Sequence, residues 1–522
     1  MDSVTALADE YWSLLKRRDP YYAILSGEQL GSIEPIDEAH VAAQSEEARG
    51  LLDRLSRTER TPDEEDLASV LEALLRSHSA WASHLWHIHP VAPYQSITLT
   101  DIAQGISARP ERERAHLSAQ FAARIRSIAA LVREQRSRDI VLPRPAVSGA
   151  RTTWIGLHTR LATLLQDEDV EKACADVLRE IDTSAAVARE VVGLAHLPDG
   201  AEVYREFVRQ ETTNDVDPDE LYRLGVEECA RLSERMAEVR SRLGGPADED
   251  EARVWVQAQP HLYAESPDAV AAAYRRHIAR VEPGIPSLFR IFPEANYDVR
   301  RADASVEAGL TFGYYQAPTP DEPVGLYRFN GSSLDKRLQL TSAALILHEL
   351  VPGHHFHLAR QNADTTLHPL QRYASGLTAF DEGWGEYASG LGWELGAYED
   401  DWDAYGRLSH ERFTAQRLVV DTALNLGHWT LPRARAFMRA NTLEDDGQIA
   451  TETLRYATDM PAQALAYRSG YLAFQHARES ASGTDIRDIH EAMIGSGAVP
   501  LSRMRQRVDQ AAALSNTVPG RL

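Results

Sequence analysis

Helical periodicity runs through almost all of this 522-residue chain and limits it to one architectural class. An apolar stripe with a 3.6-residue period over residues 7–15 ends before Arg18-Asp19-Pro20. Helix starts made of a polar cap followed by proline recur at Asp217-Pro218 and Ser266-Pro267. The sequence therefore predicts a mostly α-helical fold. Further helices are predicted over residues 36–58, 64–86, 111–136, 170–194, 402–428, 451–477 and 485–495.

Two segments interrupt the helical pattern. Residues 324–330 alternate well enough to predict one short edge strand, so we expect a small edge strand or sheet beside the helix that follows. The passage 244–251 is rich in glycine, proline and acids and is the best candidate for a hinge. It divides an N-terminal helical half, 1–243, from a C-terminal helical half, 252–522. We expect the two halves to form one continuous catalytic unit.

Charge and composition narrow the class of protein. The chain has 55 Lys plus Arg against 78 Asp plus Glu, a net charge of −23. This charge repels phosphate backbones and anionic lipid, so we expect no nucleic-acid partner and no membrane partner. No apolar run approaches the roughly 20 residues that a bilayer requires, which predicts a cytoplasmic protein. With only Cys174 and Cys229 available, any metal must be held by His and carboxylate groups.

The most informative motif follows an apolar run, Ala343–Leu347, which predicts a buried helix. This helix delivers His348-Glu349, and two further histidines, His354 and His355, follow within two turns. A zinc hydrolase needs imidazoles to bind the ion and a neighbouring carboxylate to take a proton from its water. The motif therefore predicts a Zn²⁺ site, one ion per chain, with His348 as a ligand and Glu349 as the general base. Another divalent transition metal is the alternative ion.

The second histidine ligand stays open at this point. In the usual H-E-x-x-H helix the ligands are four residues apart, but the fourth position after His348 is Pro352. Proline cannot donate to the His348 carbonyl, and Gly353 relaxes the backbone, so the helix should widen or break here. His354 needs this distortion to reach the ion, whereas His355 could approach it from the far side.

A third ligand is expected on a later helix. Glu382 and Glu386 lie one helical turn apart and face the same side, among apolar and aromatic neighbours. This pattern favours Glu382 as the carboxylate ligand and Glu386 as a group that hydrogen-bonds a ligand histidine from outside.

These motifs resemble the bacterial family of domains of unknown function numbered 885, regarded as zincin-like peptidases. The resemblance covers nearly the whole chain and is most specific at His348-Glu349-x-x-Pro352-Gly353-His354-His355. Its other matches are Ala8-Asp9-Glu10-Tyr11-Trp12, Arg18–Ala23, Gly313-Tyr314-Tyr315, Gly325-Leu326-Tyr327, Phe329-Asn330, Glu382-Gly383-Trp384, Arg417, Val420-Asp421-Thr422, Arg455-Tyr456, Pro461, Gln463-Ala464, Tyr467, Ile486-Arg487, His490, Gly497 and Pro500-Leu501.

The resemblance implies a large multi-helix zincin-like fold with a deep central cleft. Gly353-His354 is similar to the Gly-His that closes the motif of helical zinc peptidases, which favours His354 as the second ligand. Tyr467 resembles a tyrosine that donates to the tetrahedral intermediate. Arg455 or Tyr456 would orient the substrate, Arg455 as a bidentate fork on a carboxylate.

The resemblance also implies a zinc-dependent metallohydrolase that cleaves an amide bond in a small peptide or amino-acid conjugate. The predicted strand, with Tyr327 and Asn330, could pair with an extended substrate. Asn425 stands where the family usually has a histidine, and His357 where it commonly has glutamine. These departures motivate an alternative, a biosynthetic tailoring metalloenzyme acting on a specialised small molecule. A non-catalytic binding protein is a third reading, and a homodimer is an open alternative for the assembly.

Overall fold

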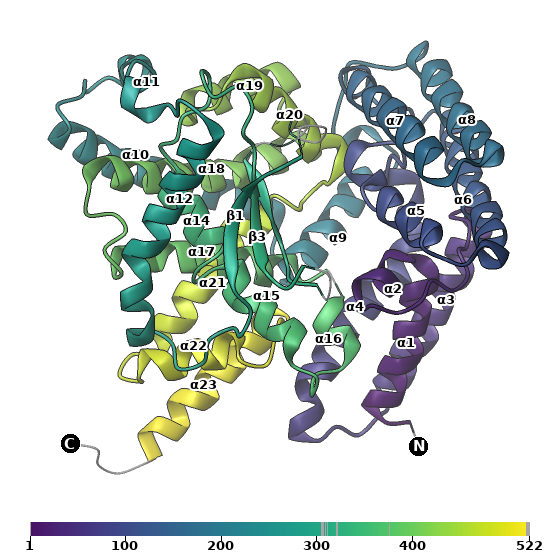
Figure 1. Ribbon diagram of the computed structural model, residues 1–522, viewed down its shortest axis with the longest axis horizontal. Helices are drawn as coiled ribbons and strands as arrows, with labels where there is room; N and C mark the ends of the chain where they lie inside the picture. The colour runs from purple at the N-terminus through teal and green to yellow at the C-terminus, as the bar shows by residue number, and fades with distance from the viewer. Residues whose placement is uncertain are drawn as a thin grey trace.

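A computed structural model describes residues 2–303, 307, 310, 312–319, 322–374 and 376–517. Helices account for 69% of the structure and strands for 3%, which confirms the predicted mostly α-helical class. The helices of the first 190 residues gather on one side of the molecule, and the sheet and the later helices form the other side (Figure 1).

Several N-terminal helices begin at a polar capping residue. The Ser3, Asp37 and Asp167 side chains accept hydrogen bonds from backbone N–H groups in the first turns of α1, α3 and α8. The predicted helix over residues 170–194 is shorter than expected, because α8 ends at Ala185. The bounds are α1 Val4–Arg18, α2 Tyr21–Leu25, α3 Glu38–Leu55, α4 Glu65–His84, α5 Leu99–Ser107, α6 Glu111–Ser137, α7 Arg144–Leu165, α8 Glu168–Ala185 and α9 Gly200–Thr212.

The C-terminal helices include one correction. The predicted single helix over residues 451–477 is wrong: α20 ends at Leu454, a π-helical turn follows over Arg455–Asp459, and α21 begins only at Leu465. Pro461 explains the interruption, since proline disfavours helical geometry at the residue before it. The bounds are α10 Pro218–Arg242, α11 Glu249–Gln257, α12 Pro267–Val281, α14 Ser342–Glu349, α15 His354–Ala363, α16 Pro369–Tyr373, α17 Thr378–Gly390, α18 Asp401–Asn425, α19 Leu431–Asn441, α20 Asp446–Leu454, α21 Leu465–Ser480, α22 Ile486–Ile494 and α23 Leu501–Thr517.

A three-stranded sheet is formed by β1 Tyr297–Arg301, β2 Gly313–Gln316 and β3 Gly325–Phe329. Its order is β1-β3-β2, with β3 parallel to β1 and antiparallel to β2. The prediction of a strand over 324–330 is confirmed, but its edge position is wrong, because β3 is central. The almost continuous burial of β3 is typical of a central strand, covered on both faces.

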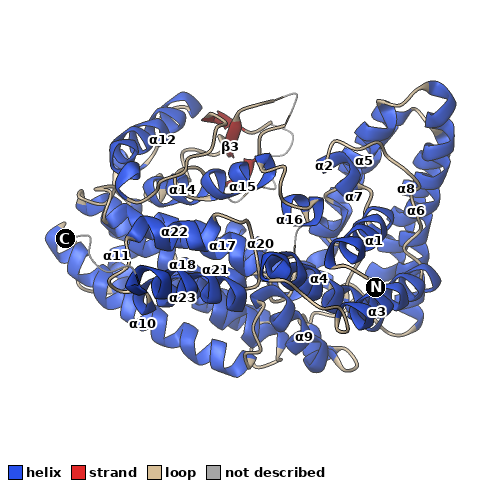
Figure 2. Ribbon diagram, turned by 90° about the horizontal axis from the view of Figure 1, so that it is seen from below, coloured by secondary structure: helices blue, strands red, loops and turns tan. Residues whose placement is uncertain are grey.

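The apolar core places α14, α17 and α18 deep in the molecule. The largest cluster of buried apolar residues contains side chains from α1, α4, α10, α14, α17, α21 and α23. Its members come from both sides of the predicted hinge at residues 244–251. In α18, every residue from Ala404 to Asn425 is buried. Figure 2 shows the sheet beside α14 and α15. Among the described residues, no helix combines the length and the apolar character needed to cross a membrane.

Candidate metal centre

The predicted break after His348-Glu349 is confirmed. Helix α14 ends at Glu349, four residues of non-helical chain follow, and α15 begins at His354. A Cβ on Gly353 would lie 1.8 Å from the carbonyl oxygen of His348, so a side chain cannot be accommodated at this position. Glycine therefore lets the chain fold back closely on the end of α14, which returns His354 to the neighbourhood of His348.

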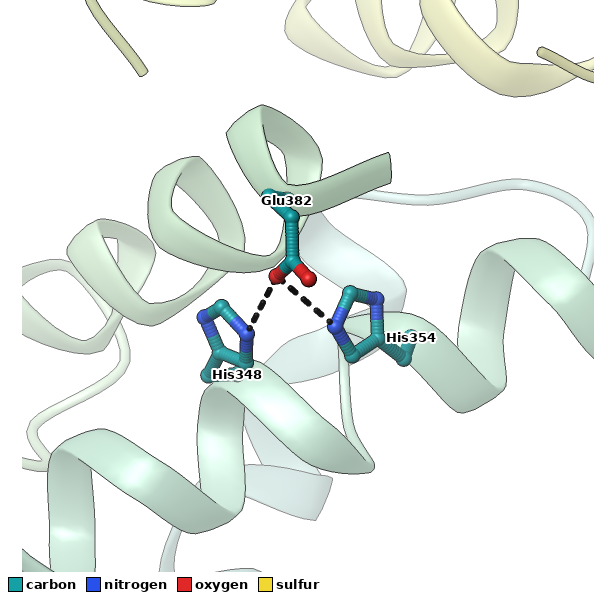
Figure 3. Close-up of side chains that lie close together, drawn as sticks. All are labelled: His348, His354 and Glu382. Atoms are coloured by element: carbon teal, nitrogen blue, oxygen red, sulfur yellow. Dashed lines mark ion pairs between the residues drawn. The ribbon is translucent and has the colours of Figure 1, made fainter. Parts of the chain in front are cut away.

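Three predicted ligands converge in the structure (Figure 3). Nε2 of His348 lies 3.3 Å and Nε2 of His354 lies 3.5 Å from the same carboxylate oxygen, Oε2 of Glu382. A Cβ on Gly385 would lie 2.7 Å from the His348 ring, so this glycine leaves the space that the ring occupies. The break in the chain, together with α17, thus assembles a His₂Glu cluster.

The second histidine of the pair faces elsewhere. Nδ1 of His355 lies 3.0 Å from the hydroxyl of Tyr315, and its Nε2 lies 3.0 Å from the carbonyl oxygen of Ala295. Because this carbonyl can only accept, Nε2 carries the proton, and Nδ1 accepts from Tyr315. Burial lowers the pKa of His355 to about 4. His355 therefore holds strand β2 and is not part of the cluster.

Glu386 occupies the predicted outer position, and two residues that the sequence analysis missed surround it. Its Oε1 lies 3.2 Å from Nδ1 of His348 and 2.7 Å from Nε2 of His410. Its Oε2 lies 3.4 Å from Nη1 of Arg407. The sequence does contain a signal for His410 and Arg407, because charged side chains one turn apart lie within a long apolar-rich segment. The helix period alone, however, does not show which face of this helix contacts α17.

The carboxylates of the cluster favour positive charge on His348. Burial lowers the pKa of His348, but its contacts with the Glu382 and Glu386 carboxylates outweigh burial and raise that pKa to about 10. Burial also opposes ionisation of these two carboxylates, yet contacts with the histidines hold the pKa of each below its ordinary value. Two ionised carboxylates thus enclose His348 and stabilise positive charge between them.

Glu349 stands next to the cluster, with a different environment. Burial is the largest effect and raises its pKa, and the Glu382 charge raises it further. The His348 and His354 rings and a hydrogen bond from the backbone N–H of Tyr315 act in the opposite direction. Glu349 therefore stands near the two histidines and β2, in surroundings that raise the pKa of its carboxyl group.

Tyr467 joins the cluster from α21. Its hydroxyl donates to Oε1 of Glu382 at 2.9 Å, and its ring stacks on His348 with centroids 6.2 Å apart. The close approach of α17 and α21 depends on Gly383 and Gly470, since a Cβ on Gly383 would lie 2.5 Å from the Gly470 Cα. The predicted catalytic tyrosine is thus in contact with a predicted ligand.

The chain matches, over residues 20–508, the family described as "Bacterial protein of unknown function (DUF885)". It belongs to this family. The structure of a "putative lipoprotein" from Colwellia psychrerythraea is similar, with a TM-score of 0.84, 21% identity, and coverage of 98% of this chain and 100% of that chain. A "putative lipoprotein of unknown function" from Shewanella oneidensis gives a TM-score of 0.76 at 16% identity, over 97% and 99% of the two chains. No curated protein matches this chain.

Two predicted substrate residues of this DUF885 chain lie in a buried polar network. Nη1 of Arg455 lies 3.3 Å from Glu452, and Arg455 is 8% exposed. Tyr456 is fully buried, donates to Glu452 and accepts from Nε of Arg417 at 3.1 Å. The Arg417 guanidinium also lies 4.4 Å from the centre of the Tyr467 ring, which links the network to the cluster. The hydroxyl of Tyr456 is thus used inside the protein.

The predicted substrate residues of β3 are also buried. Tyr327 is fully buried and packs edge-on against Tyr274, with centroids 5.2 Å apart. The amide nitrogen of Asn330 donates to the carbonyl oxygens of Glu307 and Leu310, and its amide oxygen accepts from Ser332. Both side chains thus stabilise the sheet and its loop and are not available to bind a substrate in this structure.

The two departures from the family pattern lie outside the cluster. The Asn425 amide donates to Asp421 and to the carbonyl oxygen of Tyr456, and its oxygen accepts from the backbone N–H of Leu194. His357 is buried with Nε2 3.1 Å from Asp381. Asn425 thus joins α18 to neighbouring segments.

Proposed function

We propose that this protein is a zincin-like metallohydrolase that cleaves an amide bond in a small peptide or amino-acid conjugate. The observation that carries the proposal is the convergence of His348, His354 and Glu382 beside Glu349. The donor atoms of the three ligands lie within 4.8 Å of one another. Two imidazoles, a carboxylate ligand and a neighbouring carboxylate base are the groups that helical zinc hydrolases use.

The distances in the cluster fit a metal ion. Ligand atoms about 2.0–2.1 Å from a tetrahedral Zn²⁺ ion lie roughly 3.3 Å from each other. The two Nε2-to-Oε2 distances, 3.3 and 3.5 Å, have this size. One proton on His348 compensates only one of the two negative charges, on Glu382 and Glu386, that face this ring. A divalent cation compensates both charges. The donor set suits Zn²⁺ and also accepts other divalent transition metals.

The residues around the cluster have complementary roles in amide hydrolysis. A divalent ion held there would supply a Lewis acid and lower the pKa of a bound water toward about 7. Glu349 would accept a proton from the attacking water and return it to the leaving amine nitrogen. Tyr467 would turn its O–H from Glu382 to the substrate and donate a hydrogen bond to the oxyanion that develops from the carbonyl oxygen.

The outer edge of β2 is the surface we propose for an extended substrate, in place of β3. The backbone N–H of Asn330 donates to the carbonyl oxygen of Phe312, which makes these opposite residues a hydrogen-bonded pair. In an antiparallel ladder such pairs alternate, so the backbone groups of Gly313 and Tyr315 point away from β3. The N–H of Tyr315 contacts Glu349, which orients this edge toward the cluster. A substrate paired there would run past Glu349.

Arg455 remains the best candidate for binding a substrate carboxylate. Its Nε finds no hydrogen-bond partner among the described residues, although two other nitrogens bond to Glu452 and Gln463. The guanidinium also lies 5.5 Å from the centre of the Tyr94 ring, so a segment of the N-terminal region lies beside it. We propose that a substrate carboxylate oxygen accepts from this N–H, which is buried in the structure, so the surrounding side chains would have to move to admit it.

A metal-dependent digest tests the proposed function. Purified protein is loaded with Zn²⁺, incubated with a mixture of short peptides and N-acyl amino acids, and the products are identified by mass spectrometry. We expect cleavage that a chelator abolishes and added metal restores. Metal uptake without any amide cleavage would favour the tailoring enzyme, and absence of both would favour the binding protein.

Cell fractionation tests the predicted cytoplasmic location against the lipoprotein description that the two similar structures carry.

A further inference from the structure

We infer that His410 and Arg407 on α18 are positioning residues for the metal centre: they hold Glu386, which in turn fixes the ring of His348. The inference rests on the proposed metal site and extends it to a helix that carries none of the three ligands. It concerns how the site is held, since neither α18 residue touches the donor atoms that face Glu382.

The first step is the complete use of the Glu386 carboxylate. Glu386 is 1% exposed, and its Oε1 is contacted by both Nε2 of His410 at 2.7 Å and Nδ1 of His348 at 3.2 Å. Arg407 reaches Oε2 with Nη1 at 3.4 Å and donates from Nη2 to the backbone oxygen at 3.3 Å. Partners from two other helices therefore hold this carboxylate in one orientation.

The second step is the effect on His348. Because an ionised carboxylate only accepts, the Glu386 oxygen 3.2 Å from Nδ1 of His348 favours a proton on that nitrogen, although the two groups are not aligned as a hydrogen bond. In neutral imidazole the other nitrogen then bears a lone pair, and Nε2 presents this lone pair to the cluster with Glu382 and His354. The position of Glu386 thus favours this tautomer and this orientation of the ring. A shift of Glu386 would misalign the donor atom.

The third step is the support behind Arg407. Nε of Arg407 lies 3.0 Å from Glu411, and Glu411 lies 3.4 Å from Nη1 of Arg468 on α21. Arg468 in turn pairs with Glu228 on α10. The Arg407, Glu411 and Arg468 side chains are at most 2% exposed, so displacing any one leaves an unpaired buried charge. This alternating ladder of charges makes Arg407 a rigid partner for Glu386.

A second metal ion is the competing reading of the same atoms. His348, Glu386 and His410 also offer donor atoms within 4.8 Å of one another. However, the Arg407 guanidinium already contacts Glu386, and a divalent cation beside it would meet a fixed positive charge. Such an ion would also require His348 to bind metals through both nitrogens. The charges therefore favour one ion per chain, with His410 and Arg407 as its outer support.

The test measures metal affinity of the full-length protein by competition between Zn²⁺ and a chromogenic chelator at fixed pH. We expect His410→Leu to weaken Zn²⁺ binding by about 10–100-fold, the usual loss for an outer partner of a ligand. His410→Gln, which keeps an N–H donor for Glu386, should recover most of the affinity. The visible spectrum of the Co²⁺-loaded protein should change in His410→Leu, because the His348 ring is no longer held.

A matched pair of arginine variants separates positioning from general stability. Arg407→Met and Arg412→Met each remove a buried guanidinium from α18, and Arg412 pairs with Glu249 at 3.0 Å. Both variants should unfold at lower temperature, but only Arg407→Met should weaken Zn²⁺ binding. The inference would be overturned if Arg407→Met and Arg412→Met bound Zn²⁺ with equal affinity, or if His410→Leu bound it as tightly as the wild type. Either result would leave the proposed function intact. Two ions per wild-type chain, with one lost in His410→Leu, would overturn it in favour of the second site. A wild type that binds no metal would overturn both proposals.

Discussion

Buried histidines of the N-terminal region and His348 of the candidate metal centre have opposite properties. In the N-terminal region, burial lowers the pKa of His84 and of His89 to about 4, and each residue is 6% exposed. In the candidate metal centre, His348 is 5% exposed, yet its pKa is raised to about 10. The difference lies in the neighbours, since Glu382 and Glu386 face His348, whereas burial dominates at His84 and His89. Two carboxylates on one imidazole ring, rather than burial, thus distinguish His348 from His84 and His89.

The same contrast appears between adjacent residues. His354 faces Glu382, whereas His355 faces a tyrosine hydroxyl and a backbone carbonyl and has a pKa lowered by burial to about 4. Two neighbouring histidines on one helix can therefore belong to different classes. Each of the following experiments tests one side of this distinction.

The largest difference is expected for the inner ligands. His348→Ala or Glu382→Ala should lower metal affinity by more than about 100-fold, because loss of an outer partner alone costs 10–100-fold. His84→Ala, a deletion of equal size in the other region, should leave metal content unchanged. Elemental analysis of the three purified variants checks this. Full occupancy in His348→Ala would remove the distinction between the two regions.

The next effect is on turnover. Glu349→Gln should keep the metal but lower turnover by about 10²–10⁴-fold, because an amide cannot accept the proton from water. The measurement combines elemental analysis with the amide-cleavage assay described above. His89→Gln is the control and should retain wild-type turnover. A Glu349→Gln variant with near-normal turnover would show that the base lies elsewhere.

A third effect concerns acid stability. His84 and His89 are neutral in the folded protein, with pKa values of about 4, whereas an unfolded histidine has its ordinary pKa of about 6.5. Below pH 6.5 the unfolded chain therefore binds protons that the folded chain excludes, and stability falls toward pH 4 by up to about 1.4 kcal/mol per pH unit for each residue.

Denaturant titrations between pH 7 and pH 4 measure this loss. A chelator is included so that metal release does not contribute. The variant His84→Phe/His89→Leu should lose less stability on acidification than the wild type. Parallel pH profiles of the two proteins would mean that these histidines are not the acid-sensitive groups.

The smallest effect is expected for His355→Ala. It should change metal affinity by less than about tenfold, because His355 contacts Tyr315 and Ala295 and none of the ligands. His354→Ala, the matched change one residue earlier, should lose the metal as His348→Ala does. Chelator competition on the two variants at one pH compares them. Metal loss confined to His355→Ala would reverse the assignment of the second histidine.

Local patterns were sufficient for most helices and for the identity of the candidate ligands. Caps such as Asp217 and Ser266 act within one turn, so the starts of α10 and α12 could be predicted from neighbouring residues alone. The pairing of His348 with Glu349, and the break at Pro352-Gly353, are equally local, since proline and glycine act on the backbone within a few residues.

Tertiary structure alone decided which polar groups meet. The sequence allowed either His354 or His355 as the second ligand, and the return of the chain over Gly353 placed His354 opposite Glu382. It predicted β3 as an edge, but pairing with β1 and β2 made it central. His410 and Arg407 meet Glu386 because α17 and α18 both pack against α14 and α21, so that side chains of α18 reach α17. Such contacts join residues far apart in the chain, and a helical period specifies that a face is buried without specifying the helix that covers it.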